Sequence, residues 1–153
     1  MSEIERNLKE QAAKVGHITL GTVDENGYPA QRTLASFAVA GEAVYFSTSA
    51  QSRKISHLRA RPQVSVLFQQ DGQQLGVFVN LAVTGRASVI NDAAEFQKAG
   101  SLIAARSPRF KDRWEKGQVG AETALVKVEP VELRRTDLNK GPGPASVTVI
   151  AKT

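Results

Sequence analysis

Short turns join the first three strand-like segments of this 153-residue chain, and they restrict its fold more than any other feature. The turn 24–27, Asp-Glu-Asn-Gly, separates segments 17–23 and 29–40, and the turn 40–42 precedes segment 43–47. An Asn-Gly step readily adopts the positive φ of a tight hairpin turn. Turns of this length are too short for the helical crossover that joins parallel strands. The chain is therefore predicted to form antiparallel hairpins rather than a nucleotide-binding fold built from βαβ units.

The rest of the chain extends this sheet and adds helices at its ends. Further strands are predicted over 63–69, 74–90 and 124–135, with Gly85 as a bend and Pro130 as an interruption. Helices are predicted over 3–15, 51–60, 92–105 and a short segment from Ser107-Pro108. These patterns indicate a mainly β (α+β) chain, a six-stranded antiparallel barrel with flanking short helices. We divide it into one domain over 1–138 and a Gly/Pro linker with a C-terminal arm or strand over 139–153.

Composition excludes several classes of function. The chain has no cysteine, which excludes disulfides and thiol chemistry and fits a reducing cytoplasm, and its two histidines are too few for a dedicated zinc site. Since no apolar run reaches the roughly 18 residues of a membrane span, we expect no membrane partner. The net charge of +5 comes largely from basic runs, neither of which interleaves aromatic residues as a base-stacking surface would or matches a nucleic-acid module signature. We interpret these runs as solvated helix faces and anion-site residues, not as a nucleic-acid surface.

Cations and hydroxyl groups gather where the third strand ends. The segment 48–54, Thr-Ser-Ala-Gln-Ser-Arg-Lys, leads into the helix 51–60, and Arg32 lies on the preceding strand. Helix-start N–H groups carry partial positive charge, and arginine offers a planar pair of donors, so this combination suits a phosphate monoester. Arg32 has only mildly polar neighbours on its strand and needs a partner there. Arg53 is expected to contribute least, because adjacent helical positions point about 100° apart.

Other conspicuous side chains have structural interpretations. His57 is predicted to lie on the helix surface, and His17 to be structural. Trp114 is predicted to pack the last helix onto the barrel or a second subunit. Tyr45 and Phe46 point to opposite faces of their strand, so we expect one in the core and the other in an interface.

Four motifs in a fixed order resemble the pyridoxamine 5′-phosphate oxidase-like split-barrel superfamily, which binds flavin mononucleotide (FMN). They are Gly-Thr-Val-Asp-x-x-Gly-x-Pro at 21–29, Arg-Thr-Leu at 32–34, Val-Tyr-Phe-x-Thr…Ser-Arg-Lys at 44–54 and Arg-Pro-Gln-Val-Ser-Val-Leu-Phe at 61–68. The similarity covers about residues 15–90. It implies a homodimer of split β-barrels with FMN in clefts between the subunits.

The resemblance also implies a set of FMN-binding positions. Phosphate contacts carry over to Arg32, Ser52, Arg53 and Lys54, and positions beside the ribityl chain and phosphate to Ser47 and Thr48. Positions along the flavin ring carry over to Thr33, Leu34 and Ala35. Asn80 stands where the family often has a glutamine that reaches the flavin. No catalytic residue and no metal ligand is assigned, so any redox chemistry would belong to the flavin.

The expected function is an FMN-dependent oxidoreductase with an unknown small acceptor, for which NAD(P)H is a candidate electron donor. The segment 131–137 lacks the tryptophan of true pyridoxamine-phosphate oxidases, so that activity is not expected. Two alternatives stay open. One is a flavin-binding or stress-related module without turnover, and the other is a relative that binds deazaflavin or haem.

Overall fold

The computed structural model describes residues 1–141 and 143–152. Pro142 and Thr153, which belong to the predicted segment 139–153, lie outside the described residues. The strands are β1 (Ile18–Val23), β2 (Pro29–Leu34), β3 (Phe37–Ala40), β4 (Ala43–Ser49), β5 (Gln63–Gln69), β6 (Val79–Val89), β7 (Thr123–Asp137) and β8 (Val147–Ala151). The α-helices are α1 (Glu3–Ala12), α2 (Arg53–Ala60), α3 (Ala93–Arg106) and α4 (Pro108–Glu115), and short 3₁₀ helices are η1 (Leu75–Val77), η2 (Leu138–Lys140) and η3 (Gly143–Ser146).

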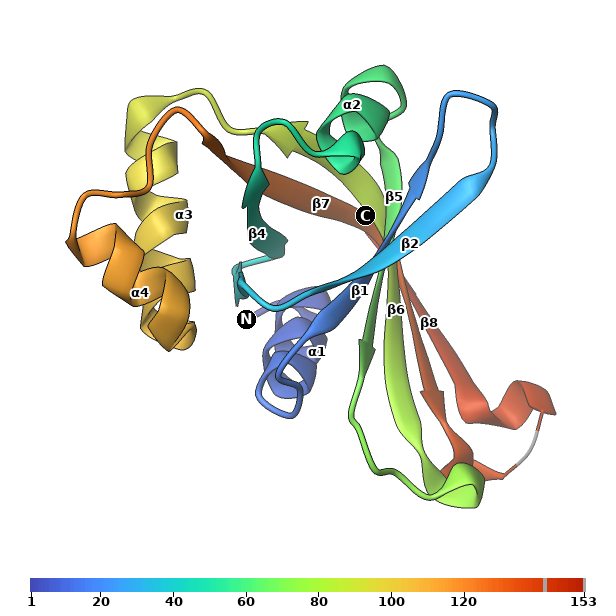
Figure 1. Ribbon diagram of the computed structural model, residues 1–153. Helices are drawn as coiled ribbons and strands as arrows, with labels where there is room; N and C mark the ends of the chain where they lie inside the picture. Colours follow the sequence, from blue (N-terminus) through green and yellow to red (C-terminus); the bar gives the residue numbers. More distant parts are fainter. Residues whose placement is uncertain (142, 153) are drawn as a thin grey trace.

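The strands form one antiparallel sheet that curls into a half-barrel (Figure 1). Its order is β2-β1-β5-β6-β7-β4-β3, with β8 paired to β7 beside this path. Strand β7 is long enough to serve two partners on one edge. Residues 123–128 pair with β4, and residues 132–136 pair with β8. The predicted mainly β, antiparallel fold with flanking helices is confirmed.

The number of strands differs from the prediction of six. The single strand predicted over 29–40 is two strands, because the chain breaks at Ala35-Ser36 and β2 and β3 lie at opposite ends of the sheet order. The C-terminal segment supplies β8, which adds an eighth strand. Strand β6 begins at Val79 rather than 74, because η1 occupies the preceding residues.

A bulge bends the sheet where Gly85 of β6 faces Pro130 of β7. The register between these strands shifts between Thr84 and Gly85. A Cβ at Gly85 would lie 2.6 Å from the Glu129 carbonyl oxygen, so only glycine permits this backbone approach. Proline has no N–H to donate and is tolerated in a strand at such an irregularity. The predicted bend and interruption are therefore one structural feature.

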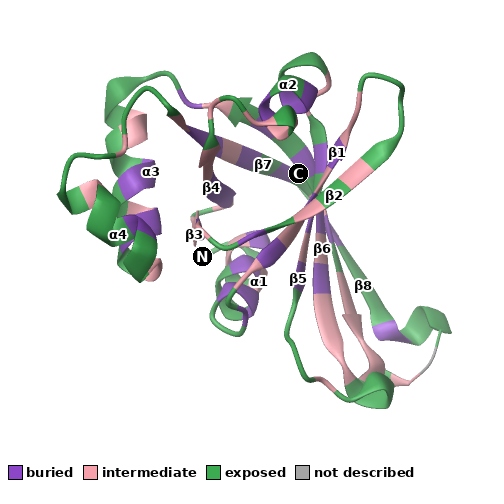
Figure 2. Ribbon diagram, in the orientation of Figure 1, coloured by how far each residue is buried: buried purple, intermediate pink, exposed green. Residues whose placement is uncertain are grey.

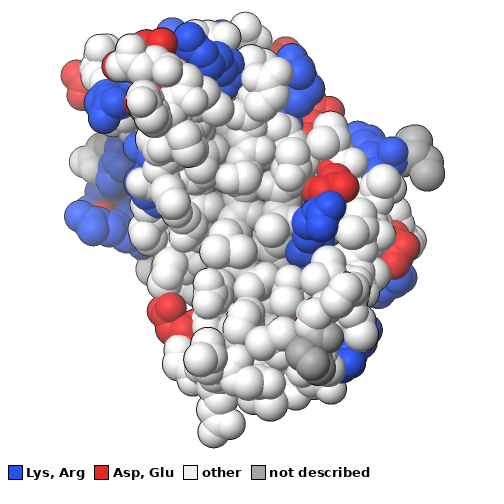
Figure 3. Space-filling view, turned by 90° about the vertical axis from the view of Figure 1, so that its right-hand side faces the viewer, with Lys and Arg blue, Asp and Glu red and all other residues white. Residues whose placement is uncertain are grey.

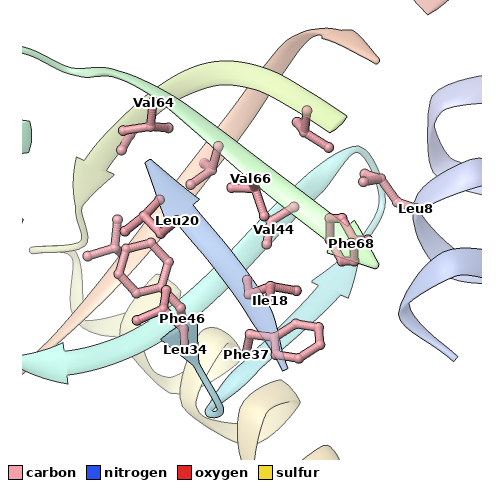
Figure 4. Close-up of a cluster of buried hydrophobic side chains, with 14 of the residues drawn as sticks. Leu8, Ile18, Leu20, Leu34, Phe37, Val44, Phe46, Val64, Val66 and Phe68 are labelled. Carbon is pink, nitrogen blue, oxygen red and sulfur yellow. The ribbon is translucent and has the colours of Figure 1, made fainter. Parts of the chain in front are cut away.

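The main hydrophobic core fills the concave side of the half-barrel. Figure 4 shows side chains from β1, β3, β4 and β5 converging there with Leu8 of α1. Helix α1 buries Ile4, Leu8 and Ala12 against the sheet and exposes its opposite face (Figure 2). Ser2 caps this helix by accepting a hydrogen bond from the Glu5 N–H at 3.1 Å. The helix ends at Ala12, three residues earlier than predicted.

A second core lies between β3, β4, β7 and the helices α3 and α4. Tyr45 and Phe46 point to opposite faces of β4, yet both are buried within the chain, Phe46 in the main core and Tyr45 in the second one. The expectation that one of them lies in an interface is wrong, because α3 and α4 cover that face. The rings of Trp114 in α4 and Phe96 in α3 have centroids 6.1 Å apart, and this contact packs α4 against α3 and this core. In the described part of the chain, no helix is both long and apolar enough to cross a membrane.

Candidate functional site

Helix α2 begins shortly after the end of β4. Ser52 occupies the N-cap position, but its side chain caps no N–H of the helix and lies 3.3 Å from Thr48 Oγ1. Helix α2 begins at Arg53, two residues later than predicted, because the chain first makes a turn between Ser49 and Ser52. N–H groups that no side chain caps, together with a serine hydroxyl at a helix start, form a donor set that favours an anion.

Lys54 brings its ammonium group back toward the end of β4. Its Nζ donates to Thr48 Oγ1 at 2.7 Å and the side chain is half-buried. Burial, followed by the nearby charge of Arg32, lowers the pKa of Lys54 below its ordinary value. The ammonium group therefore lies where positive charge is unfavourable, and it keeps donors that Thr48 does not use.

Arg32 reaches this cluster from β2. One terminal nitrogen, Nη1, donates to Thr22 Oγ1 at 2.7 Å and to the carbonyl oxygens of Leu20 and Ala30 at 3.3 and 3.2 Å. Burial, followed by the charge of Arg53, lowers the pKa of Arg32. Three cations from two elements thus lie close enough to disfavour one another.

Acidic side chains do not compensate this cluster. Among residues 1–141 and 143–152, no carboxylate oxygen lies within 4 Å of a charged nitrogen of Arg32, Arg53 or Lys54. Asp24 lies within electrostatic range of Arg53, but its carboxylate accepts hydrogen bonds from the backbone N–H groups of Tyr28 and Asn26. Those N–H groups, led by that of Tyr28, lower the pKa of Asp24. The positive charge of Arg32, Arg53 and Lys54 is therefore not paired with a carboxylate among the described residues.

His57 is buried, which corrects the prediction of a surface histidine. Its side chain is 3% exposed because α2 turns this face toward the sheet together with Ile55 and Leu58. Nδ1 lies 3.0 Å from Thr22 Oγ1. Nε2 lies 3.5 Å from the Glu25 carboxylate but has no hydrogen-bond partner within the described residues. Enclosed in this way, His57 does not present a nitrogen to a ligand.

A groove of about 580 Å³ adjoins the cations along the end of β4. It is lined by Ala35, Ser36, Ser47, Thr48, Ser49, Arg109, Phe110, Arg113, Glu122 and Thr123. Thr48 belongs to both features, since it lines the groove and accepts the hydrogen bond of Lys54. Arg113 Nη2 donates to Thr123 Oγ1 at 3.1 Å. A groove of this volume is large enough for a small-molecule ligand, and the cations lie beside it.

Seven of the ten predicted positions lie at this cluster or groove: Arg32, Ala35, Ser47, Thr48, Ser52, Arg53 and Lys54. The side chain of Arg53 is exposed, and Arg53 is counted here because its positive charge lowers the pKa of Arg32. Thr33 is exposed on β2, whereas Leu34 is 6% exposed and packs in the main core, so only its backbone is free to line a ligand.

Asn80 lies apart from the other positions in one chain. It pairs with Gln69 and Thr136 near the start of β6. Strands β1 and β5 lie between Arg32 and β6, because Arg32 pairs with Leu20, Leu20 with Val66, and Val66 with Val83. Three strand spacings amount to about 14 Å at 4.8 Å each, and Asn80 lies three residues further along β6 than Val83. A single subunit does not bring Asn80 to the cations.

Sequence reasoning overlooked two contributions to the site. Thr22 follows Ile18 and Leu20 on the inward face of β1, so its period of two could have identified it as a buried polar residue in need of a partner. Arg109 and Arg113 stand four residues apart on α4, but no local pattern shows that this helix face borders β4. In the described part of the chain, no group of three or more His, Asp or Glu side chains is arranged to hold a metal ion.

The chain matches a known protein family. The family model for pyridoxamine 5′-phosphate oxidase matches residues 4–137. No curated protein sequence matches the chain. Among solved structures, a conserved hypothetical protein from Mycobacterium tuberculosis is 21% identical, with 90% of this chain and 86% of that chain covered and a TM-score of 0.73.

Two further structures share the fold. The haem storage protein HutZ from Vibrio cholerae is 23% identical over 84% of this chain and 91% of that chain, with a TM-score of 0.65. A Clostridium acetobutylicum protein related to general stress protein 26 is 13% identical over 97% of this chain and 94% of that chain, with a TM-score of 0.70. At these identities the likeness extends to the fold alone.

Proposed function

Because this chain belongs to the pyridoxamine 5′-phosphate oxidase family, we propose that it is an FMN-binding oxidoreductase that passes electrons or hydride to a small acceptor. One observation carries the proposal. Arg32 and Lys54 are half-buried, have no carboxylate within 4 Å among the described residues, and have lowered pKa values. A phosphate monoester would supply the missing negative charge and accept their free N–H groups.

Different residues of the site are proposed to bind the phosphate and the ring of FMN. Arg32 and Lys54 hold the phosphate from two sides, and Ser52 and Thr48 add hydroxyl donors. The backbone around Ala35 and the side chain of Ser47 line the groove for the ring. Bound flavin supplies the capacity to take up and release hydride equivalents, which the side chains of this site lack. The protein orients the cofactor and excludes water from the covered side of the ring.

The active form is proposed to be a homodimer, in which Asn80 of a second subunit is free to approach the ring. Large apolar side chains are exposed on η1, β7 and β8: Leu75, Val77, Val131, Val147 and Val149. Most of the face in Figure 3 shows neither acidic nor basic side chains, and charges gather toward its rim. Exposed apolar side chains and a surface with few charges are each suited to contact a second subunit.

Reconstitution of the purified protein tests the proposal. We expect FMN to bind at least tenfold more tightly than riboflavin, since each charge-assisted hydrogen bond to phosphate contributes about 1.5–3 kcal/mol. Equal affinity for the two would contradict the phosphate site. A single deazaflavin band or a haem Soret band in the protein as purified would favour those alternatives instead.

Turnover distinguishes an oxidoreductase from a flavin-binding module. With FMN bound, NAD(P)H oxidation is expected with at least one small acceptor from a panel, and pyridoxamine 5′-phosphate is expected to remain unoxidised. Tight FMN binding without turnover across the panel would leave a carrier or stress-related module. Formation of hydrogen peroxide with pyridoxamine 5′-phosphate would instead show that the protein is a pyridoxamine-phosphate oxidase.

A further inference from the structure

A buried hydrogen-bonded chain lies behind Arg32 and leads away from the proposed phosphate site. Arg32 Nη1 lies 2.7 Å from Thr22 Oγ1, and Thr22 Oγ1 lies 3.0 Å from His57 Nδ1. Thr22 is 2% exposed and His57 is 3% exposed. Beyond them Nε2 of His57 faces Glu25 at 3.5 Å. Arg61 holds the turn that carries Glu25 against the end of α2 through a hydrogen bond to the Glu25 carbonyl.

The chemistry of these groups assigns a direction to the chain. A guanidinium group only donates, so Thr22 Oγ1 must accept from Arg32. In the Nε2–H tautomer of His57, Thr22 donates its remaining proton to the unprotonated Nδ1. The ring proton then lies on Nε2, 3.5 Å from the Glu25 carboxylate, whose negative charge favours this tautomer. Charged groups on other elements near His57 are Asp24 and Glu25 in the β1–β2 turn and Arg32 in β2; Arg53 lies on its own helix.

This arrangement restrains one end of the guanidinium and leaves the other end available. The three hydrogen bonds of Arg32 all use Nη1, and within the described residues Nη2 and Nε make none. An arginine side chain has many rotamers, so an anion gains from a guanidinium plane that is already oriented. Removal of the Thr22 hydroxyl would keep the charge of Arg32 but loosen its orientation.

We propose that His57 is a positioning residue for Arg32, acting through Thr22, and that it sharpens the preference of the site for a phosphate-bearing flavin. This inference rests on the proposed FMN function. The bound phosphate would touch Arg32, whereas His57 would orient the Thr22 hydroxyl whose oxygen accepts the hydrogen bond from Arg32. A histidine that merely filled space would affect the binding of FMN and riboflavin equally.

A double-mutant cycle on the full-length protein tests this role, with the ratio of riboflavin Kd to FMN Kd as the readout. Thr22→Val and His57→Leu are each expected to lower this ratio about threefold to tenfold. His57→Asn, whose amide oxygen is able to accept near the position of Nδ1, is expected to stay within about twofold of the wild type. In an Arg32→Met background, neither Thr22→Val nor His57→Leu is expected to change the ratio further.

Other outcomes overturn specific parts of the reasoning. Losses of the same size in the Arg32→Met background would show that His57 does not act through Arg32. A wild-type protein that does not prefer FMN would overturn the proposed function and this inference with it. Should His57→Leu fail to fold, His57→Phe, which keeps an aromatic ring but has no acceptor, takes its place in the cycle. Imidazole ¹⁵N chemical shifts give a ligand-free check: the Nε2–H tautomer supports the direction of the chain, and an Nδ1–H tautomer overturns it.

Discussion

Replacement of Lys54 by methionine is expected to weaken FMN binding without destabilising the apoprotein. Lys54 Nζ donates one hydrogen bond to Thr48 Oγ1 and has two further donors for a phosphate oxygen. Loss of one charge-assisted hydrogen bond costs about 1.5–3 kcal/mol, which raises the FMN Kd about 10-fold to 150-fold. Riboflavin affinity is expected to change by less than about twofold, because riboflavin has no phosphate. Isothermal titration with both flavins measures this difference.

In the apoprotein, Lys54→Met is expected to leave thermal stability unchanged or raise it, in contrast to its effect on FMN binding. Burial and the charge of Arg32 make the Lys54 ammonium unfavourable before a ligand binds. Methionine keeps the apolar stem and removes the charge, so the apo Tm is expected to stay constant or rise by about 1–2 °C. Arg59→Met is the matched control, since Arg59 is an exposed cation on the same helix. Equal losses for FMN and riboflavin, or a Tm several degrees lower for Lys54→Met, would refute a ligand-binding role for Lys54.

Further measurements test other parts of the structure. Gly85→Ala is expected to lower the free energy of unfolding by about 1–3 kcal/mol, because its Cβ would meet the Glu129 carbonyl, whereas the control Gly120→Ala, with open space around its Cβ, should stay within about 0.5 kcal/mol in urea titrations. Inorganic phosphate is expected to raise the apo Tm in wild-type protein more than in an Arg32→Met/Lys54→Met double variant, and an equal rise in both would indicate a general salt effect. Light scattering is expected to give twice the 16.5 kDa mass of one chain, and Val149→Glu, on the exposed face of β8, should shift it toward the monomer; a monomeric wild type at micromolar concentration would contradict the two-subunit site.

Features that depend on neighbouring residues could be predicted from the sequence. The hairpin at 24–27 forms because Gly27 adopts a φ of 85° and the Asp24 side chain accepts hydrogen bonds from Asn26 and Tyr28. Asp92 caps α3 by accepting from the Glu95 N–H at 2.9 Å, as its capping pattern indicates. The position of Lys54 in the first turn of α2 follows from the same kind of local signal. Each of these depends on a few consecutive residues, so the amino-acid order alone contains the information.

Features that join distant segments were decided by the tertiary structure. Thr22 and His57 are 35 residues apart, and the break after Ala35 sends β3 to the edge of the sheet opposite β2. The burial of His57, the groove between β4 and α4, and the pairing of β8 with β7 likewise follow from how the sheet curls. The sequence determined which residues are able to bind an anion, because charge and hydrogen-bonding capacity belong to each side chain. Only the folded sheet decided which of them share one site, because burial and distance belong to the packing of the whole chain.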